Sequence, residues 1–371
     1  MKYFKAPLIF ILLVTITSEI VAQQTCSDPQ DIIPVGRQVY MIGEVHLDQD
    51  GQSPENIAMI SRTAFVEDSI RKYLVNQCGV NHFLLELPNC YGYFVRQYIT
   101  TGDTSWIYFL GENNYYYYSR LKNLRYLNEL KPGLRATCVD VNYAQNTNRT
   151  IFALLTLTFY DHYTKVYYPP YNDIKVIPVS ADLNVAISIM KTDTNNIKPS
   201  TRIFFKELIK LVIMGDDADT LFYDLLVKTN SDQLLMKELK TFYGTGWEEV
   251  ELIIDSYMYG FNIKKLDLKN LLAREPKFFG FSSEIIEHSP GDVYCLQLGD
   301  AHLDNDPEKN MMRQRITNKF GWKPFCIHLV PQTSAARLER INKLNSPYDF
   351  NFLGPSCIYS LTDLDINVLI H

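Results

Sequence analysis

The sequence predicts an α/β protein with a mainly parallel central sheet, made of two related halves and a helical insertion. An apolar run that ends in glycine and then in acidic and histidine residues occurs twice, as QVYMIGEVHLDQD over residues 38–50 and as VYCLQLGDAHLDND over residues 293–306. A helical pattern, a glycine and a further apolar run follow each copy. Because a strand, a helix and a second strand in this order join parallel strands, each half predicts one βαβ unit. Ligands of such sheets bind at the carboxyl ends of the strands, where both copies of the motif fall.

The first half begins with a strand over residues 38–43. Ser53 and Pro54 then predict the start of a helix, because serine caps helix starts and proline suits the first helical position. Apolar residues keep a helical spacing until Gly79, which ends the helix. The run HFLLELP follows, and it predicts a strand over residues 82–87.

The second half repeats this plan. A strand is expected over residues 293–298, and Asp306 and Pro307 predict the start of the next helix. Gly321 ends that helix, and the run PFCIHLV predicts a strand over residues 324–330.

The segment between the halves carries further elements. A helical stretch begins near Tyr115 and closes at Pro132, and a strand over residues 134–140 places Asp140 at its carboxyl end. The run VIPVSADL does the same for Asp182.

Residues 197–275 are mostly helical in pattern, which indicates a helical insertion or a cap over the sheet. Beyond Val330 the chain is rich in Asn, Ser, Pro and Gly, which predicts a long tail on the surface rather than another domain.

The amino-terminal residues 1–22 have the layout of a cleaved signal peptide. Lys2 and Lys5 precede an apolar stretch, and Ala22 provides a small residue for cleavage. The sequence therefore predicts an exported protein, secreted or periplasmic, whose mature chain is a single α/β domain over residues 23–371. No other stretch approaches the roughly 20 apolar residues of a membrane helix, so no membrane span is expected after cleavage.

The charge balance restricts the partners. The chain has 36 Lys and Arg against 42 Asp and Glu, a net charge of −6, and no basic run, so nucleic acid is not an expected partner. A small molecule or a peptide is the expected substrate, and the oligomeric state stays open. The chain also lacks a G-x-S-x-G elbow, a P-loop and a G-x-G-x-x-G motif, which disfavours a serine hydrolase, an NTPase and a nicotinamide enzyme.

The chain contains seven cysteines, an odd number that cannot all pair within one chain. Three lie in apolar runs and predict buried free thiols: Cys138, Cys295 and Cys326. The other four are candidates for disulfides in an oxidising compartment: Cys26, Cys78, Cys90 and Cys357.

The two motifs supply the candidate acid and base groups. Glu44 lies two residues before His46, so on an extended strand both side chains point to one side, and a carboxylate there can raise the basicity of the imidazole. His302 is the histidine of the second copy. Glu86 stands among leucines in HFLLELP and must be paired, protonated or functional. A hydrogen-bonded histidine and a structural ion pair are the alternative interpretations.

Two arginines are candidates for binding or for charge stabilisation. Arg62 lies about two turns into the first helix, and Arg274 lies among apolar residues in LLAREPKFF. Such an arginine either pairs with a buried carboxylate or stabilises an oxyanion, and both interpretations stay open. His82 and His288 are expected at the surface.

The motifs GEVH, LELP and GDAH, with the stretch LLAREPKFFGFSSEII before the last of them, resemble the superfamily of erythromycin esterase-like, ChaN-like and TraB/Tiki proteins. The resemblance implies an α/β sheet with helical additions, in which paired histidines and acids line one cleft. The residues that match best are Glu44, His46, Glu86, Arg274 and His302, with Arg62 a looser match. One residue separates Glu44 from His46, which is closer to the ChaN and Tiki patterns than to the esterase pattern.

The resemblance implies one of two functions. The first is a hydrolase of an ester or amide, with or without the assistance of a metal ion, in which His46 activates water, Glu44 or Glu86 orients it, His302 assists proton transfer, and an arginine stabilises negative charge. The alternative is a haem- or metal-binding uptake protein without catalysis. The cofactor stays open: a divalent metal ion is the first choice, with His46, Glu44, Glu86 and His302 as its candidate ligands, and haem is the second.

Overall fold

The computed structural model describes residues 33–44, 54–106, 115–142, 146–155, 198–214, 218–263, 268–331, 348–349, 357–361 and 365–370. The predicted signal peptide, His46 and the predicted strand before Asp182 lie outside these residues. The expectations that depend on them, export and the domain limits 23–371, stay predictions.

The described residues form an eight-stranded sheet in the order β3-β2-β4-β1-β5-β8-β7-β6. The strands from β3 to β8 in this order run parallel, and β7 pairs antiparallel with both β8 and β6. The predicted α/β fold with a mainly parallel sheet is therefore confirmed. The strands are β1 (Val39–Glu44), β2 (His82–Pro88), β3 (Arg135–Asp140), β4 (Tyr294–Gly299), β5 (Phe325–Pro331), β6 (Tyr348–Asp349), β7 (Cys357–Leu361) and β8 (Asp365–Ile370).

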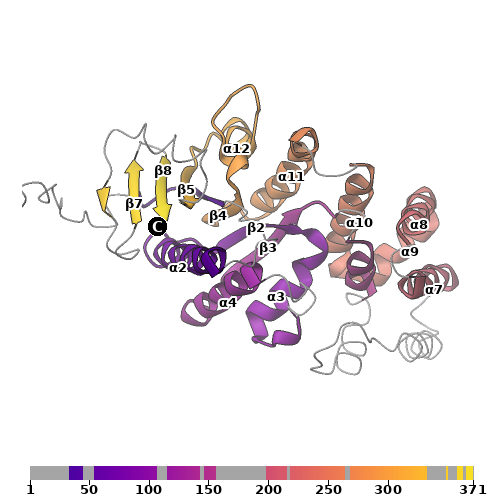
Figure 1. Ribbon diagram of the computed structural model, residues 1–371. Helices are drawn as coiled ribbons and strands as arrows, with labels where there is room; N and C mark the ends of the chain where they lie inside the picture. Colours follow the sequence, from indigo (N-terminus) through magenta and orange to yellow (C-terminus); the bar gives the residue numbers. More distant parts are fainter. Residues whose placement is uncertain are drawn as a thin grey trace, which may run out of the picture.

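The two βαβ halves interleave in this sheet. Strand β4 of the second half lies between β1 and β2, and β1 of the first half lies between β4 and β5. As a result the two copies of the motif end on neighbouring strands, with Glu44 opposite Gly299. The crossovers β1–α2–β2 and β4–α12–β5 run in opposite directions along the sheet. Right-handed connections then place α2 and α12 on opposite faces, as Figure 1 shows.

Alternate residues of the strands build two cores. Tyr40 and Ile42 of β1 belong to the core shared with α2, α3 and α4, whereas Val39 and Met41 belong to the core shared with α11 and α12. Because both faces are covered, the strands are apolar at nearly every position, and this is why continuous apolar runs located them. The five predicted strands that fall on described residues agree with the structure to within one residue at each end.

Helices cover both faces and extend beyond one edge of the sheet. Figure 1 shows α7, α8 and α9 grouped beyond β3. The described part of residues 197–275 is thus helical, and its role as an insertion into one domain stays a prediction. The helices are α2 (Pro54–Asn76), α3 (Gly92–Thr101), α4 (Tyr115–Leu130), α7 (Pro199–Met214), α8 (Asp219–Ser231), α9 (Gln233–Tyr243), α10 (Trp247–Asn262), α11 (Leu268–His288), α12 (Met312–Phe320) and a helix over residues 147–155.

The predicted helix start at Asp306 and Pro307 is wrong, since α12 begins at Met312. The carboxylate of Asp306 accepts a hydrogen bond from the backbone amide of Glu308, and Asn310 has a positive φ of 47°. These local side-chain bonds favour a turn over a helix.

The predicted surface tail beyond Val330 is also wrong for the residues that form strands. β8 adds to the sheet beside β5, and β7 and β6 follow it. The run Ile366–Ile370 lies in a strand because β5 offers it an edge to pair with, which the sequence alone does not reveal.

The buried thiols follow the prediction in part. Cys138, Cys295 and Cys326 are buried and free as expected, but Cys78 and Cys90 are buried free thiols as well rather than disulfide partners.

His82 is buried, contrary to the expectation, whereas His288 is exposed. The ring nitrogens of His82 lie 3.2 Å from Asp292 Oδ2 and 2.9 Å from Thr137 Oγ1. Burial and the nearby Arg135 lower the pKa of His82 to about 3, so its imidazole is neutral.

We expect Gly43→Ala to destabilise the protein by about 1–3 kcal/mol, because overpacking forces neighbours to move. A Cβ atom at Gly43 would lie 2.5 Å from Asp300 Oδ1 and 2.8 Å from Leu303 Cδ2. Urea unfolding measures the change. The control is Gly280→Ala in α11, where no atom lies within 4 Å and alanine should stabilise the helix by up to about 1 kcal/mol. Equal effects of the two substitutions would contradict the tight contact.

Candidate active site

The carboxyl ends of neighbouring parallel strands bring several ionisable residues to one edge of the sheet. Glu44 ends β1, Asp140 ends β3, and Glu86 lies near the end of β2. His302 follows β4 in a short 3-10 turn, Asp300–Leu303. β4 ends at its motif glycine, Gly299, and β1 ends one residue after Gly43, at Glu44.

Arg274 of α11 connects two of these carboxylates. Its Nη1 atom donates to Asp140 Oδ2 at 2.8 Å, and its Nη2 atom donates to Glu86 Oε1 at 2.5 Å. Arg274 is only 6% exposed. Removing one partner from a buried ion pair usually costs about 3–5 kcal/mol, because the other charge is left uncompensated. Arg274 therefore pairs with carboxylates, which is one of the two interpretations that the sequence left open, and it has two partners instead of one.

His302 lies in the same cluster and has acidic neighbours at both ring nitrogens. Its Nδ1 lies 2.5 Å from Glu275 Oε2, and its Nε2 lies 3.3 Å from Glu86 Oε1. Arg274 Nη2 is 3.2 Å from the same Nε2. Burial lowers the pKa of His302, but Glu86 and Glu275 outweigh it and raise the pKa to about 10. The geometry thus favours an imidazolium, which can donate a proton.

Glu86 also contacts the second motif directly. Its Oε2 atom accepts a hydrogen bond from the backbone amide of Gly299. Glu86 therefore binds a guanidinium, lies beside an imidazole and fixes the turn that carries this imidazole. We name Glu86, Asp140, Arg274, Glu275 and His302 the Arg274 cluster.

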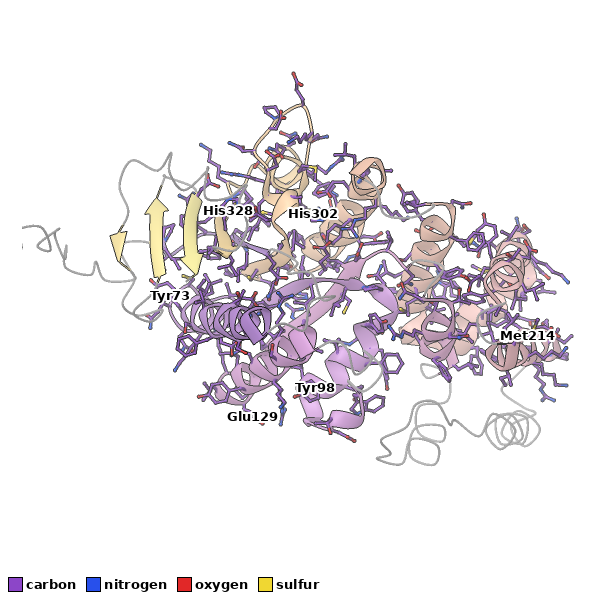
Figure 2. The ribbon with its side chains drawn as sticks, viewed as in Figure 1. Tyr73, Tyr98, Glu129, Met214, His302 and His328 are labelled. Atoms are coloured by element: carbon purple, nitrogen blue, oxygen red, sulfur yellow. The ribbon has the colours of Figure 1, made fainter. Side chains whose placement is uncertain are left out.

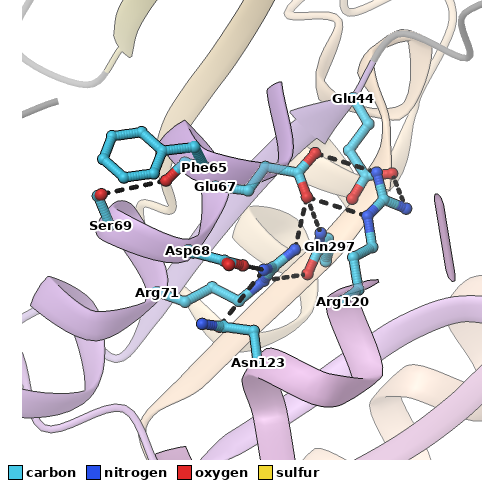
Figure 3. Close-up of polar contacts among 9 residues, drawn as sticks. All are labelled: Glu44, Phe65, Glu67, Asp68, Ser69, Arg71, Arg120, Asn123 and Gln297. Atoms are coloured by element: carbon cyan, nitrogen blue, oxygen red, sulfur yellow. Dashed lines mark hydrogen bonds and ion pairs between the residues drawn. The ribbon is translucent and has the colours of Figure 1, made fainter. Parts of the chain in front are cut away.

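A second cluster surrounds Glu44, as Figure 3 shows. Its partners come from α2 and α4, on the face of the sheet opposite to α11, which carries Arg274. Glu44 Oε2 lies 2.5 Å from Arg120 Nη1. Glu67 accepts from Arg120 at 3.0 Å through both Nε and Nη2, and from Arg71 Nη2 at 2.5 Å. The Gln297 side chain of β4 bridges Arg71 and Glu67: it accepts a hydrogen bond from Arg71 and donates one to Glu67. We name Glu44, Glu67, Arg71, Arg120 and Gln297 the Glu44 cluster.

The environment of Glu44 shifts the pKa of its carboxyl group. Glu44 is 3% exposed, and burial raises its pKa to about 8 although Arg120 lowers it. A carboxyl with a pKa near neutrality can both release and accept a proton, which is the property that general acid and base chemistry requires.

A small pocket joins the two clusters at the carboxyl edge. Its polar lining comes from Glu44, Glu86, Arg120 and Gln297, and its apolar lining from Leu85, Leu87 and Leu121. Glu44 and Glu86 thus line one pocket. His302 is not part of this lining and lies behind it, in contact with Glu86. Of the predicted site residues, His46 and the side chain of Arg62 lie outside the described atoms.

The sequence did not single out Glu275, Glu67 or Arg120. Glu275 directly follows Arg274, and Glu67 and Arg71 have the i,i+4 spacing of a helical ion pair. These positions in the sequence could have identified Glu275 and Glu67 as partners of the two arginines. Arg120 lies in a helix with no distinguishing pattern, so only the packing of α4 against α2 identifies it.

The described residues contain no group of three or more His, Cys, Asp or Glu side chains placed to hold a metal ion. Both ring nitrogens of His302 face carboxylates, and the guanidinium of Arg274 stands beside them. A cation added there would meet positive charge. The described donors around His302 therefore do not fit a divalent metal ion. Among the described helices, none combines the length and hydropathy that a bilayer crossing requires.

Neither a protein-family model nor a curated protein matches the sequence. Three solved structures are distantly similar in fold, each 12% identical. An erythromycin esterase mutant in its open conformation has a TM-score of 0.42 over 92% of this chain and 77% of that chain. A protein from Bacillus cereus has a TM-score of 0.42 over 87% and 76%. A succinoglycan biosynthesis protein has a TM-score of 0.41 over 80% and 66%. The likeness to ChaN-like and TraB/Tiki proteins stays a prediction from the motifs.

The charged state of His302 makes a prediction about pH. The pKa of His302 is about 10 in the folded protein, against about 6.5 in an unfolded chain. Protonation of His302 therefore stabilises the folded state fully below about pH 6.5, and this stabilisation is lost as the pH rises through 10. The free energy of unfolding should therefore fall more steeply between pH 7 and 10 in the parent protein than in His302→Gln. The exposed His288→Gln serves as the control and should follow the parent curve. Parallel curves for the parent and His302→Gln would contradict the imidazolium.

Proposed function

We propose that this protein is a hydrolase of ester or amide bonds whose acid and base groups lie at the carboxyl edge of the sheet. The observation that carries the proposal is the placement of His302 between Glu275 and Glu86, beside Arg274, at the end of the sheet where Glu44 borders a pocket. Parallel sheets bind their ligands at this edge.

The energetic cost of the two clusters supports a functional interpretation. Each ionisable side chain buried here gives up its hydration, and apolar residues of similar size would often make a core at least as stable. Ionisable groups with strongly perturbed pKa values that meet at a pocket mark active sites more often than ordinary cores. Glu44, which lines the pocket, and His302, which contacts the lining residue Glu86, have such pKa values.

The proposed reaction uses one base and one acid. His46 takes a proton from water, and Glu44, two residues earlier in the motif, orients it. The hydroxide attacks the carbonyl carbon, and the positive charge of Arg274 and His302 stabilises the developing negative charge. His302 then protonates the leaving alcohol or amine as the carbonyl bond to it breaks. The products are a carboxylic acid and that alcohol or amine.

His46→Ala should leave the fold intact and lower the rate by about 10²- to 10⁴-fold, the usual contribution of a general base. Hydrolysis of a panel of ester and amide substrates measures the rate, and thermal unfolding checks the fold. His288→Ala, at an exposed position of α11, is the control and should keep the parent rate. An unchanged rate in His46→Ala, on a substrate that the parent hydrolyses, would remove His46 from the mechanism.

The second candidate function is binding of haem or a metal ion for uptake. It rests on the motif resemblance and on His46, since the described donors do not fit an ion. We propose export for either function because residues 1–22 have the layout of a signal peptide.

Metal analysis of protein purified without added metal, together with an absorption scan after haem addition, separates the two functions. The hydrolase proposal expects substoichiometric metal and no Soret band shift. A stoichiometric haem complex with no turnover of any ester or amide in the panel would replace the hydrolase with the uptake protein.

A further inference from the structure

A third group of charged residues lies on the α11 and α12 side of the sheet, outside both clusters. His328 of β5 places Nδ1 2.6 Å from Asp300 Oδ1 and Nε2 3.3 Å from Asp365 Oδ1. Arg313 of α12 donates to both oxygens of Asp365, at 2.6 and 3.1 Å. His328 and His302 are both labelled in Figure 2.

His328 occupies a costly position for an ionisable side chain. It lies within the apolar run FCIHLV and is 5% exposed. Burial lowers its pKa, but the hydrogen bonds to Asp300 and Asp365 outweigh it, so the pKa of His328 is raised. An apolar residue would fill the same space without needing two carboxylate partners. The position therefore calls for a role beyond packing.

Asp300 stands where the two motifs touch. It follows Gly299, which pairs with Glu44 across the sheet, and it precedes His302 by two residues. Its carboxylate lies so close to Gly43 that a Cβ atom there would overlap it. The glycine of the first motif thus makes room for the aspartate of the second.

We infer that His328 is a positioning residue: it holds Asp300 against Gly43, and through the turn that follows β4 it sets the place of His302. This role rests on the proposed function, because the group that it positions is the proposed proton donor. Asp365 and Arg313 support His328 from the other side. Short turns transmit displacements directly, and a misplacement of about 1 Å can reduce a rate by roughly 100-fold.

The test combines a spectroscopic and a kinetic measurement on His328→Gln. The protein is labelled with ¹⁵N-histidine, and the His302 imidazole signals are assigned by comparison with His302→Gln. In His328→Gln we expect the His302 signals to shift and kcat to fall by about 10- to 100-fold, with KM nearly unchanged.

The matched control is His82→Gln. His82 is likewise buried, at 4% exposed, and likewise has partners at both ring nitrogens, but it lies at the opposite end of the strands. The His82→Gln substitution should lower the melting temperature without shifting the His302 signals or changing kcat. Should His328→Gln not fold, Asp365→Asn tests the same support with a smaller change, since the Asp365 side chain is 22% exposed.

The two measurements separate this inference from the proposed function. If the parent hydrolyses no substrate, the proposed function fails, yet the His302 signals still report whether His328 positions that side chain. Unmoved His302 signals in both His328→Gln and Asp365→Asn, with only a lower melting temperature as in His82→Gln, would overturn the inference.

Discussion

The pairing of β1 with β4 is the constraint on which the rest of the site depends. It brings together two motifs that lie more than 250 positions apart and fixes Glu44 opposite Gly299. The contact is close enough that Gly43 accepts the Asp300 carboxylate only because it lacks a side chain. With the strand ends so placed, α11 supplies Arg274 and Glu275 from one face, and α2 and α4 supply their ion pairs from the other.

Charge neutralisation follows from that arrangement. Glu86 and Asp140 share one guanidinium, while Glu67 binds two, so no described carboxylate of these clusters is buried without a cation nearby. Glu44 departs from this balance, because burial outweighs the pull of Arg120. Such an imbalance is tolerated where a proton must move and is usually avoided elsewhere.

The sequence predicted the strands and the charged residues at their ends better than it predicted the contacts among them. Continuous apolar runs that end at Gly43 and Gly299 mark buried parallel strands, because both faces of the sheet are covered. The acid of LELP and Arg274 were recognised as charges in apolar surroundings, which forces them to pair. The contact between Glu86 and Arg274 depends on the order of the strands in the sheet. The sequence of neither half indicates that β4 inserts between β1 and β2.

Other features depended on long-range packing as well. His82 begins a strand, where exposure is a reasonable expectation, yet Asp292 and Thr137 enclose it. β8, which carries Asp365, comes after a segment with the composition of a loop. It forms a strand because it can pair with the edge of β5. The start of α12 was misjudged for a local reason, since Asp306 bonds to the backbone of Glu308.

The interleaving of the halves also governs the order in which the chain can fold. During synthesis β1, β2 and β3 leave the ribosome first, but β1 and β2 are not neighbours, and the strand that joins them is made more than 200 residues later than β2. Until then β1 has unpaired edges, which are prone to association with other chains. Pairing over such sequence separations slows folding, since the loop must close before the contacts form. The same topology that unites the two motifs therefore makes the nascent chain dependent on late contacts, and on whatever shields β1 until β4 arrives.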